Sequence, residues 1–256
     1  MAPLTTIESA VAEKLQDRDG RSLAESLLPA LSDTEIAGLE TRWKRPLPRP
    51  IKELLAVYSG FVFAPMGLVR FQGMEDCALP EIFPLSRALA KDDEGNQWII
   101  DIRVDAEDWG PVFFVCHDPP VVVLQANDLS ELLEQIFGSA RAGQPNLIDI
   151  VSQKLALEVW KTGSVGIPIQ DAKIFADEEL RFFANELPDD WAIIDLRARR
   201  VGSGFAWGRG GPTTPLARMG SELIFAVGPS RKPTFFRRLL TRIAPGHAWG
   251  YSREIR

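Results

Sequence analysis

The chain has 256 residues, of which 45% are hydrophobic and 25% charged, a composition typical of globular proteins that fold throughout. This length exceeds that of one average domain, so two domains are expected. No apolar run approaches the roughly 18 residues of a membrane helix, and the acidic segment 1–20 does not resemble a signal peptide, which argues against a membrane protein and favours the cytoplasm.

Reactive side chains are scarce, and charge is distributed unevenly along the chain. Two cysteines and two histidines are too few for a disulfide framework or a multi-histidine metal site, so no cofactor, metal or catalytic residue is predicted. Residues 197–256 carry twelve basic and two acidic side chains, a net charge of +10, and the total of -6 therefore leaves -16 on residues 1–196. An acidic body followed by a basic end predicts charged partners.

The first 30 residues are predicted to form two helices. Thr6 is a suitable cap for the first, and Gly20 is a suitable end. Between them, apolar residues recur at the four-residue spacing of one helix face: Ile7, Val11 and Leu15. A second short helix is expected over 23–28.

Two longer helices are predicted next. Ser32 and Glu35 have the spacing of a capping box, and they precede the apolar stripe Ile36, Leu39 and Trp43. Pro50 suits the first turn of the following helix, whose stripe is Ile51, Leu54, Leu55 and Tyr58. We expect Gly60 to end this helix.

From Phe61 onward, short β-rich runs replace the helical spacing. Turn residues separate four of these runs, which predict an antiparallel meander: Leu68–Phe71, Trp98–Ile102, Val112–Cys116 and Val121–Leu124. Asp128 and Glu131 then cap a helix that ends at Gly138. The segment 138–146 is small, polar and rich in Gly, so we expect a domain boundary inside it.

The remaining residues mix helices with strands. Apolar spacing predicts helices over 147–161, 177–187 and 235–243, and strands over 191–196 and 222–227. The last helix pairs an apolar stripe with basic residues on its other positions, and the stripe consists of Phe236, Leu239, Leu240 and Ile243. A smaller α+β domain is therefore expected at the C-terminal end.

Two blocks of residues resemble the SUKH superfamily, the group of bacterial toxin-immunity proteins related to the yeast cell-wall assembly regulator. The first block is Ile36-x-x-Leu39-Glu40-x-x-Trp43, Leu47-Pro48-x-x-Ile51-x-x-x-Leu55 and Ser59-Gly60-Phe61. The second is Asp93-x-Gly95-Asn96-x-Trp98-x-x-Asp101, Trp109-Gly110-Pro111-Val112-Phe113-Phe114 and His117-Asp118. The resemblance covers about 33–137, less than half of the chain.

The resemblance implies an α+β fold in which helices pack on an antiparallel sheet. It divides the chain into an N-terminal helical extension (1–31), a SUKH-like domain (32–140) and a smaller α+β C-terminal domain of unknown type (146–256). Because the helices must cover one face of the sheet, we expect one buried cluster of Ile36, Leu39, Trp43, Ile51, Leu55 and Trp98.

The resemblance also implies a binding function without an active site. Most interpreted members are immunity proteins, which neutralise toxins exchanged between competing bacteria, often nucleases, and a minority are regulators or scaffolds. An acidic body suits a basic target, and nucleases are basic because they bind phosphates. We therefore expect a cytoplasmic, non-enzymatic protein that occludes a cognate nuclease toxin. The alternative is an intracellular regulatory or scaffold protein of the cell-wall assembly regulator type.

The acidic stretch 91–108 is the expected partner surface, because it holds seven acidic residues against two basic ones. Asp101 is left out of the set because it falls within a predicted strand. The predicted partner-binding residues are Asp92, Asp93, Glu94, Asp105, Glu107 and Asp108.

Two other patterns resemble catalytic or nucleotide sites, and for both we favour a structural explanation. Cys116-His117-Asp118 resembles a nucleophile, a base and an orienting acid, but consecutive strand residues point to opposite faces and do not converge. Gly202 and Gly204 resemble a phosphate-binding loop, yet no helix pattern follows at once.

A calcium site and a nucleic-acid surface are disfavoured as well. Asp92, Glu94 and Asn96 alternate like the start of a calcium loop, but Gln97 stands where a glycine is needed and Arg103 where a glutamate is needed. The basic C-terminal segment has the charge to bind phosphates, but the acidic body opposes nucleic acid.

Overall fold

The computed structural model describes residues 2–102, 109–163, 166–209 and 214–229. Within these ranges the chain has an α+β fold with antiparallel sheets, as the sequence predicts. The N-terminal part contains α1 (Pro3–Ala12), α2 (Leu23–Ser26), α3 (Asp33–Trp43) and α4 (Arg49–Leu55). A sheet of order β1-β2-β3 lies among them and is built from β1 (Leu27–Leu28), β2 (Gly60–Phe63) and β3 (Gly67–Arg70).

The capping box of α3 is confirmed, and several helix boundaries differ from the prediction. Glu35 N donates to Ser32 Oγ at 3.3 Å, and Ser32 N donates to the Glu35 carboxylate at 2.8 Å. Helix α1 starts at Pro3, a favoured first helical residue, so Thr6 lies inside it and does not cap it. Helix α1 ends at Ala12, well before Gly20, and α2 ends at Ser26, because Leu27 and Leu28 pair with β2 as strand β1. Helix α4 ends at Leu55, and Gly60 does not end it but is the first residue of β2.

The central sheet has the strand order β10-β7-β6-β5-β4. Its strands are β4 (Arg87–Lys91), β5 (Gln97–Ile100), β6 (Val112–His117), β7 (Pro120–Ala126) and β10 (Gly204–Ala206). Strands β5, β6 and β7 form the predicted meander, but the fourth predicted run, Leu68–Phe71, falls mainly in β3 of the other sheet. Strands β4 and β10 were not predicted, and β10 joins from the C-terminal segment. A Cβ on Gly204 would lie 2.1 Å from the Val122 carbonyl oxygen, so the glycine allows this close pairing.

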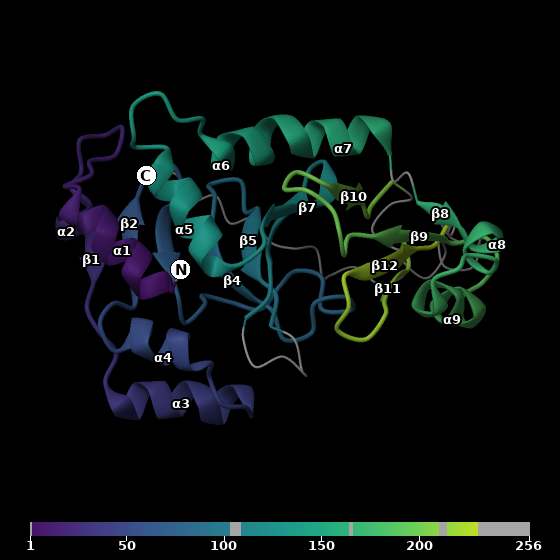
Figure 1. The fold of residues 1–256 in the computed structure, drawn as a ribbon, viewed down its shortest axis with the longest axis horizontal. Coiled ribbons are helices and arrows are strands. Elements are labelled where there is room, and N and C mark those ends of the chain that lie inside the picture. Colours follow the sequence, from purple (N-terminus) through teal and green to yellow (C-terminus); the bar gives the residue numbers. More distant parts are fainter. Residues whose placement is uncertain (1, 103–108, 164–165, 210–213, 230–256) are drawn as a thin grey trace, which may run out of the picture.

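Two further layers complete the fold (Figure 1). A sheet of order β11-β12-β9-β8 consists of β8 (Ile167–Pro168), β9 (Ala192–Asp195), β11 (Leu216–Arg218) and β12 (Ile224–Val227). Phe225 and Ile194 face the central sheet, whereas Ile193 and Ile224 face the helix pair α8 (Ile169–Ala172) and α9 (Glu178–Glu186). Figure 1 shows this pair at the end of the molecule opposite α1 and α3.

Helices lie on both sides of the predicted domain boundary. Helix α5 (Leu129–Gly138) precedes it, and α6 (Leu147–Asp149), the π-helix η1 (Ile150–Leu155) and α7 (Ala156–Thr162) follow it. The predicted helix over 147–161 is therefore present, with a π-helical turn in its middle. Ile148, Val151 and Ala156 belong to the same core as Ile7 of α1. Residues 147–162 thus pack with residues 1–140. The division into two domains stays a prediction. The predicted helix over 235–243 lies outside the described residues.

The expected buried cluster is present. One core contains all six of its members, Ile36, Leu39, Trp43, Ile51, Leu55 and Trp98. The Trp98 ring lies 4.9 Å from the Phe114 ring, and its Nε1 donates to Gln125 Oε1 at 3.1 Å. Both the apolar face and the polar tip of this indole therefore have partners inside the protein.

A buried ion pair joins the central sheet to the outer one. Arg218, at the end of β11, donates to both carboxylate oxygens of Asp101 at 2.9 and 2.7 Å. The two side chains are 5% and 1% exposed. Arg218 also donates to the carbonyl oxygens of Ile82, Ser221 and Glu222. Its guanidinium thus donates both to oxygen atoms of the N-terminal half of the chain and to oxygen atoms next to β11.

We expect Trp98→Ala to lower the free energy of unfolding by about 3–5 kcal/mol, because a buried indole leaves a large cavity and Gln125 loses a partner. Urea unfolding followed by fluorescence measures this change. A loss below about 1 kcal/mol would mean that Trp98 does not support the core.

We expect Arg218→Met to lower the free energy of unfolding by about 3–5 kcal/mol, because Asp101 would stay buried without its counter-charge. The matched control is Arg200→Met, since Arg200 is exposed, and it should change stability by less than about 0.5 kcal/mol. Equal stability of the two variants would contradict the structural role of the pair.

Candidate functional site

A cleft of about 470 Å³ lies where the turns of the central sheet meet η1 and α7. Its apolar lining includes Trp98, Phe114 and Leu157, and Leu157 is 40% exposed. Its charged lining consists of the carboxylates of Asp92, Asp93, Glu94, Asp118 and Asp149 and the guanidinium of Arg18. Five negative groups thus face one positive group, and we call this feature the acidic cleft.

The β4–β5 turn supplies three of the five carboxylates, and they have two different tasks. Asp92 Oδ1 accepts from the N–H groups of Glu94 and Asn96 at 3.0 and 2.8 Å, and its Oδ2 accepts from Asn96 Nδ2 at 2.8 Å. Gly95 adopts a φ of +86°, which completes the turn. Asp92 therefore holds the turn, while the side chains of Asp93 and Glu94 are exposed and present charge to solvent.

The opposite side of the cleft comes from distant parts of the chain. Asp118 lies in the β6–β7 turn and is exposed. Asp149, in α6, accepts from Asn146 Nδ2 at 2.7 Å, and Arg18 Nη1 lies 3.9 Å from its Oδ2. This last ion pair is largely exposed and contributes little to stability. The cleft consequently keeps an excess of negative charge.

The Cys116-His117-Asp118 sequence serves the architecture of the cleft. Asn96 Oδ1 accepts from His117 N at 3.2 Å and lies 3.0 Å from His117 Nδ1, so Asn96 ties the two turns together. Burial raises the pKa of the Cys116 thiol to about 11, although the Asp118 N–H donates to it. A thiol with this pKa is protonated at neutral pH and is a poor nucleophile.

The structure brings together half of the predicted partner-binding residues. Asp92, Asp93 and Glu94 line the acidic cleft, whereas Asp105, Glu107 and Asp108 lie outside the described residues. Three further residues of the cleft were not predicted, because nothing in their local sequence connects them with the acidic stretch: Arg18, Asp118 and Asp149.

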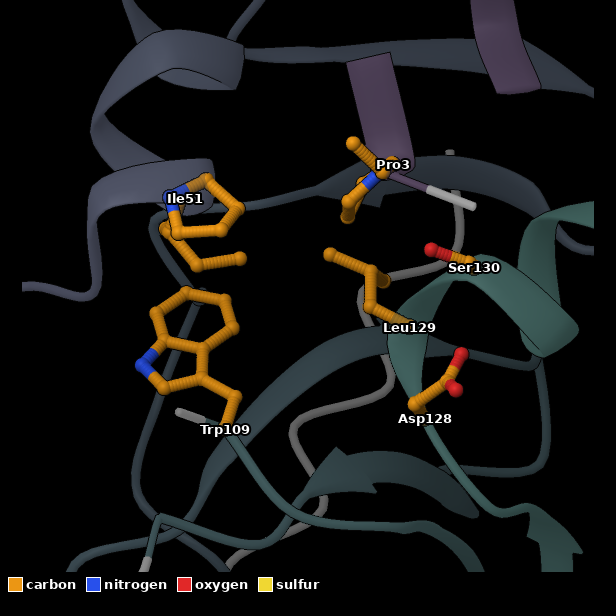
Figure 2. Close-up of a pocket in the computed structure, with 8 residues that line it drawn as sticks. Pro3, Ile51, Trp109, Asp128, Leu129 and Ser130 are labelled. Atoms are coloured by element: carbon orange, nitrogen blue, oxygen red, sulfur yellow. The ribbon is translucent and has the colours of Figure 1, made fainter. Parts of the chain in front are cut away.

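Two smaller hollows are less suited to a charged partner. Figure 2 shows the first, of about 170 Å³, where Pro3, Ile51, Trp109 and Leu129 converge. Its carboxylate, Asp128, already caps α5 by accepting from Glu131 N at 2.8 Å. The second, of about 300 Å³, lies between α7 and β9, and its charged lining residues, Asp195 and Arg199, have opposite signs.

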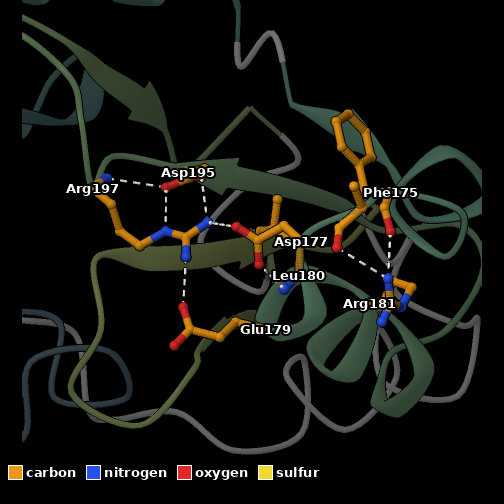
Figure 3. A network of polar contacts seen from close by, with 8 residues as sticks. Phe175, Asp177, Glu179, Leu180, Arg181, Asp195 and Arg197 are labelled. Carbon is orange, nitrogen blue, oxygen red and sulfur yellow. Dashed lines mark hydrogen bonds and ion pairs between the residues drawn. The ribbon is translucent and has the colours of Figure 1, made fainter.

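Three described arginines of the basic C-terminal part have partners within the protein. Figure 3 shows Arg197 donating to the carboxylates of Asp177, Glu179 and Asp195. Arg209 lies over the Trp160 ring with its Cζ 4.9 Å from the centroid. Together with Arg218, these residues are used in packing, which weakens the nucleic-acid alternative.

Comparisons of the chain with protein-family models, with curated proteins and with solved structures found no match. Within the described residues, no group of three or more histidine, cysteine or acidic side chains is arranged to hold a metal ion. None of the helices in the described ranges combines the length and the apolar character that crossing a membrane requires.

We expect both cysteines of the native protein to resist alkylation by iodoacetamide at pH 8. Burial raises the pKa of Cys77 to about 12 and that of Cys116 to about 11, so each thiolate is a small minority at this pH. Mass spectrometry counts the added groups, and the control is the same protein in urea, where both should react. Rapid alkylation of native Cys116 would restore it as a candidate nucleophile.

Proposed function

We propose that the protein is a cytoplasmic immunity protein of the SUKH type, which binds a cognate bacterial toxin and blocks it by occlusion. The observation that carries this proposal is the acidic cleft, with its exposed carboxylates beside apolar side chains. A basic nuclease is the favoured class of toxin, because its phosphate-binding surface carries the opposite charge.

The two kinds of lining fit the side chains that such a surface presents. A lysine or arginine has an apolar stem and a charged head, so it can contact Leu157 while its head meets Asp93 or Glu94. Because Asp92 fixes the turn, these two carboxylates are held in place before binding. Binding then costs less conformational entropy than it would on a flexible loop.

Electrostatic attraction would act mainly on the rate of encounter. Negative charge gathered in a cleft attracts a basic protein over several ångströms and orients it, and salt screens this effect. A toxin held in this way would have its phosphate-binding surface covered, which prevents access of nucleic acid. The mechanism requires no chemical step in the immunity protein.

The first experiment is a pull-down of the full chain from its native host with mass spectrometry, followed by co-expression. Recovery of a secreted, modular toxin whose lethality the chain suppresses supports the immunity function. Recovery of a cellular protein, without protection from any neighbouring toxin, supports the regulatory or scaffold alternative and contradicts our proposal.

We expect the double variant Asp93→Asn and Glu94→Gln to associate with the captured partner about three- to tenfold more slowly at low salt, because two steering charges are lost. Surface plasmon resonance at several salt concentrations measures the rate, which should depend less on salt for the variant. Asp92 is kept because it builds the turn.

The matched control is Glu25→Gln with Asp33→Asn, which removes two exposed charges from α2 and α3. This control should keep most of the original rate, because its charges lie outside the acidic cleft. Equal slowing by both double variants would show that net charge, and not the cleft, directs association.

A further inference from the structure

The α8–α9 pair presents apolar side chains that the fold leaves uncovered. Ile174 and Phe175, which follow α8, are 83% and 42% exposed, and Phe182 of α9 is 62% exposed. Arg181 Nη1 donates to the carbonyl oxygens of Phe175 and Ala176 at 2.9 and 3.1 Å, which holds the segment after α8 against α9 (Figure 3). We call Ile174, Phe175 and Phe182 the apolar patch.

The same hairpin is acidic. Residues 171–190 contain seven acidic and two basic side chains, a net charge of -5. Some of these carboxylates bind Lys173 or Arg181 within the hairpin, or Arg197 just after β9. Three more are exposed on its surface: Asp171, Glu186 and Asp190. An apolar patch surrounded by carboxylates suits a ligand that is apolar and basic.

The C-terminal part of this chain has that chemistry. Residues 231–243 carry five basic side chains and no acidic one, a net charge of +5. Their apolar residues, Phe236, Leu239, Leu240 and Ile243, have the spacing of one helix face. The charge and the apolar spacing of this segment therefore complement those of the α8–α9 pair.

The last described strand, β12, ends near the start of α8. A Cβ on Gly228, just after β12, would meet the Trp191 ring, and the Trp191 carbonyl oxygen accepts from Ile169 N at the start of α8. The six residues 229–234 span up to roughly 20 Å when extended. Helix α9, with nine residues, is only about 14 Å long. The segment that follows residue 234 can thus reach the apolar patch.

From this position, charge and spacing we propose that residues 235–243 dock on the apolar patch of α8–α9 within the same molecule. The docked segment covers Ile174 and Phe182 with its apolar stripe, and its arginines face the carboxylates of the hairpin. This inference concerns the chain alone and does not depend on toxin binding.

Hydrogen–deuterium exchange on the full chain tests the docking. The variant Ile174→Ser with Phe182→Ser should exchange the amides of 235–243 at least about tenfold faster than the original protein, because the docked segment is released. Both side chains are exposed, so the variant should fold, and unchanged protection of β6 checks this. The matched control is Val57→Ser, since Val57 is 39% exposed and lies after α4.

Three results would overturn the proposal. The first is that the amides of 235–243 in the original protein exchange as fast as those of an unfolded chain. The second is that these amides are protected equally in the original protein and in the patch variant. The third is protection that falls over a roughly hundredfold dilution, which would identify a second copy as the occupant. If the patch variant keeps the protection of 235–243 and a Leu157→Ser variant loses it, the segment lies in the acidic cleft and not on the apolar patch.

Discussion

The ion pair between Asp101 and Arg218 is the constraint on which the stacking of the two larger sheets depends. Apolar contacts between sheet faces have no preferred direction, so Phe113 and Phe225 alone would tolerate sliding. A bidentate pair between a guanidinium and a carboxylate has a fixed geometry. Since both charges are out of water, losing the pair leaves an uncompensated charge. The pair therefore sets the position of β11 and β12 on the central sheet, and with them the position of α8 and α9.

The strands of the central sheet could be predicted from sequence because both faces of the sheet are buried. Such strands appear as continuous apolar runs, as in Val112–Cys116. The same runs do not reveal what covers each face: Phe114 packs on Trp98 in the core that includes the N-terminal helices, whereas its neighbour Phe113 packs with Phe225 of β12. The short strands β10 and β11 have three residues each, too few for a periodic signal, and their pairing is decided by contacts far along the chain.

The same distinction between local and distant contacts explains how much of the acidic cleft was predictable. Asp92, Asp93 and Glu94 are consecutive, so a run of charge beside a predicted turn pointed to them. Asp118 and Asp149 reach the cleft only through the β6–β7 turn and the packing of α6, which no local pattern encodes. Asp101 belongs to the same acidic stretch, and its position in a predicted strand set it apart, but its buried partner Arg218 lies 117 residues further along the chain and could not be predicted. Counting charges along a sequence cannot separate these cases.

The positive charge of the C-terminal part falls into two groups, one within the described residues and one after residue 229. Up to residue 229, Arg197 and Arg218 neutralise carboxylates inside the fold, so these positive charges are not available to the cleft. Residues 230–256 carry seven basic side chains and one acidic one, and a segment with this charge would compete with a basic partner if it entered the acidic cleft. In the docking that we propose, the basic segment meets a different acidic surface, that of α8–α9. The acidic cleft, in which Arg18 faces five carboxylates, would then keep its excess negative charge for the partner that we propose.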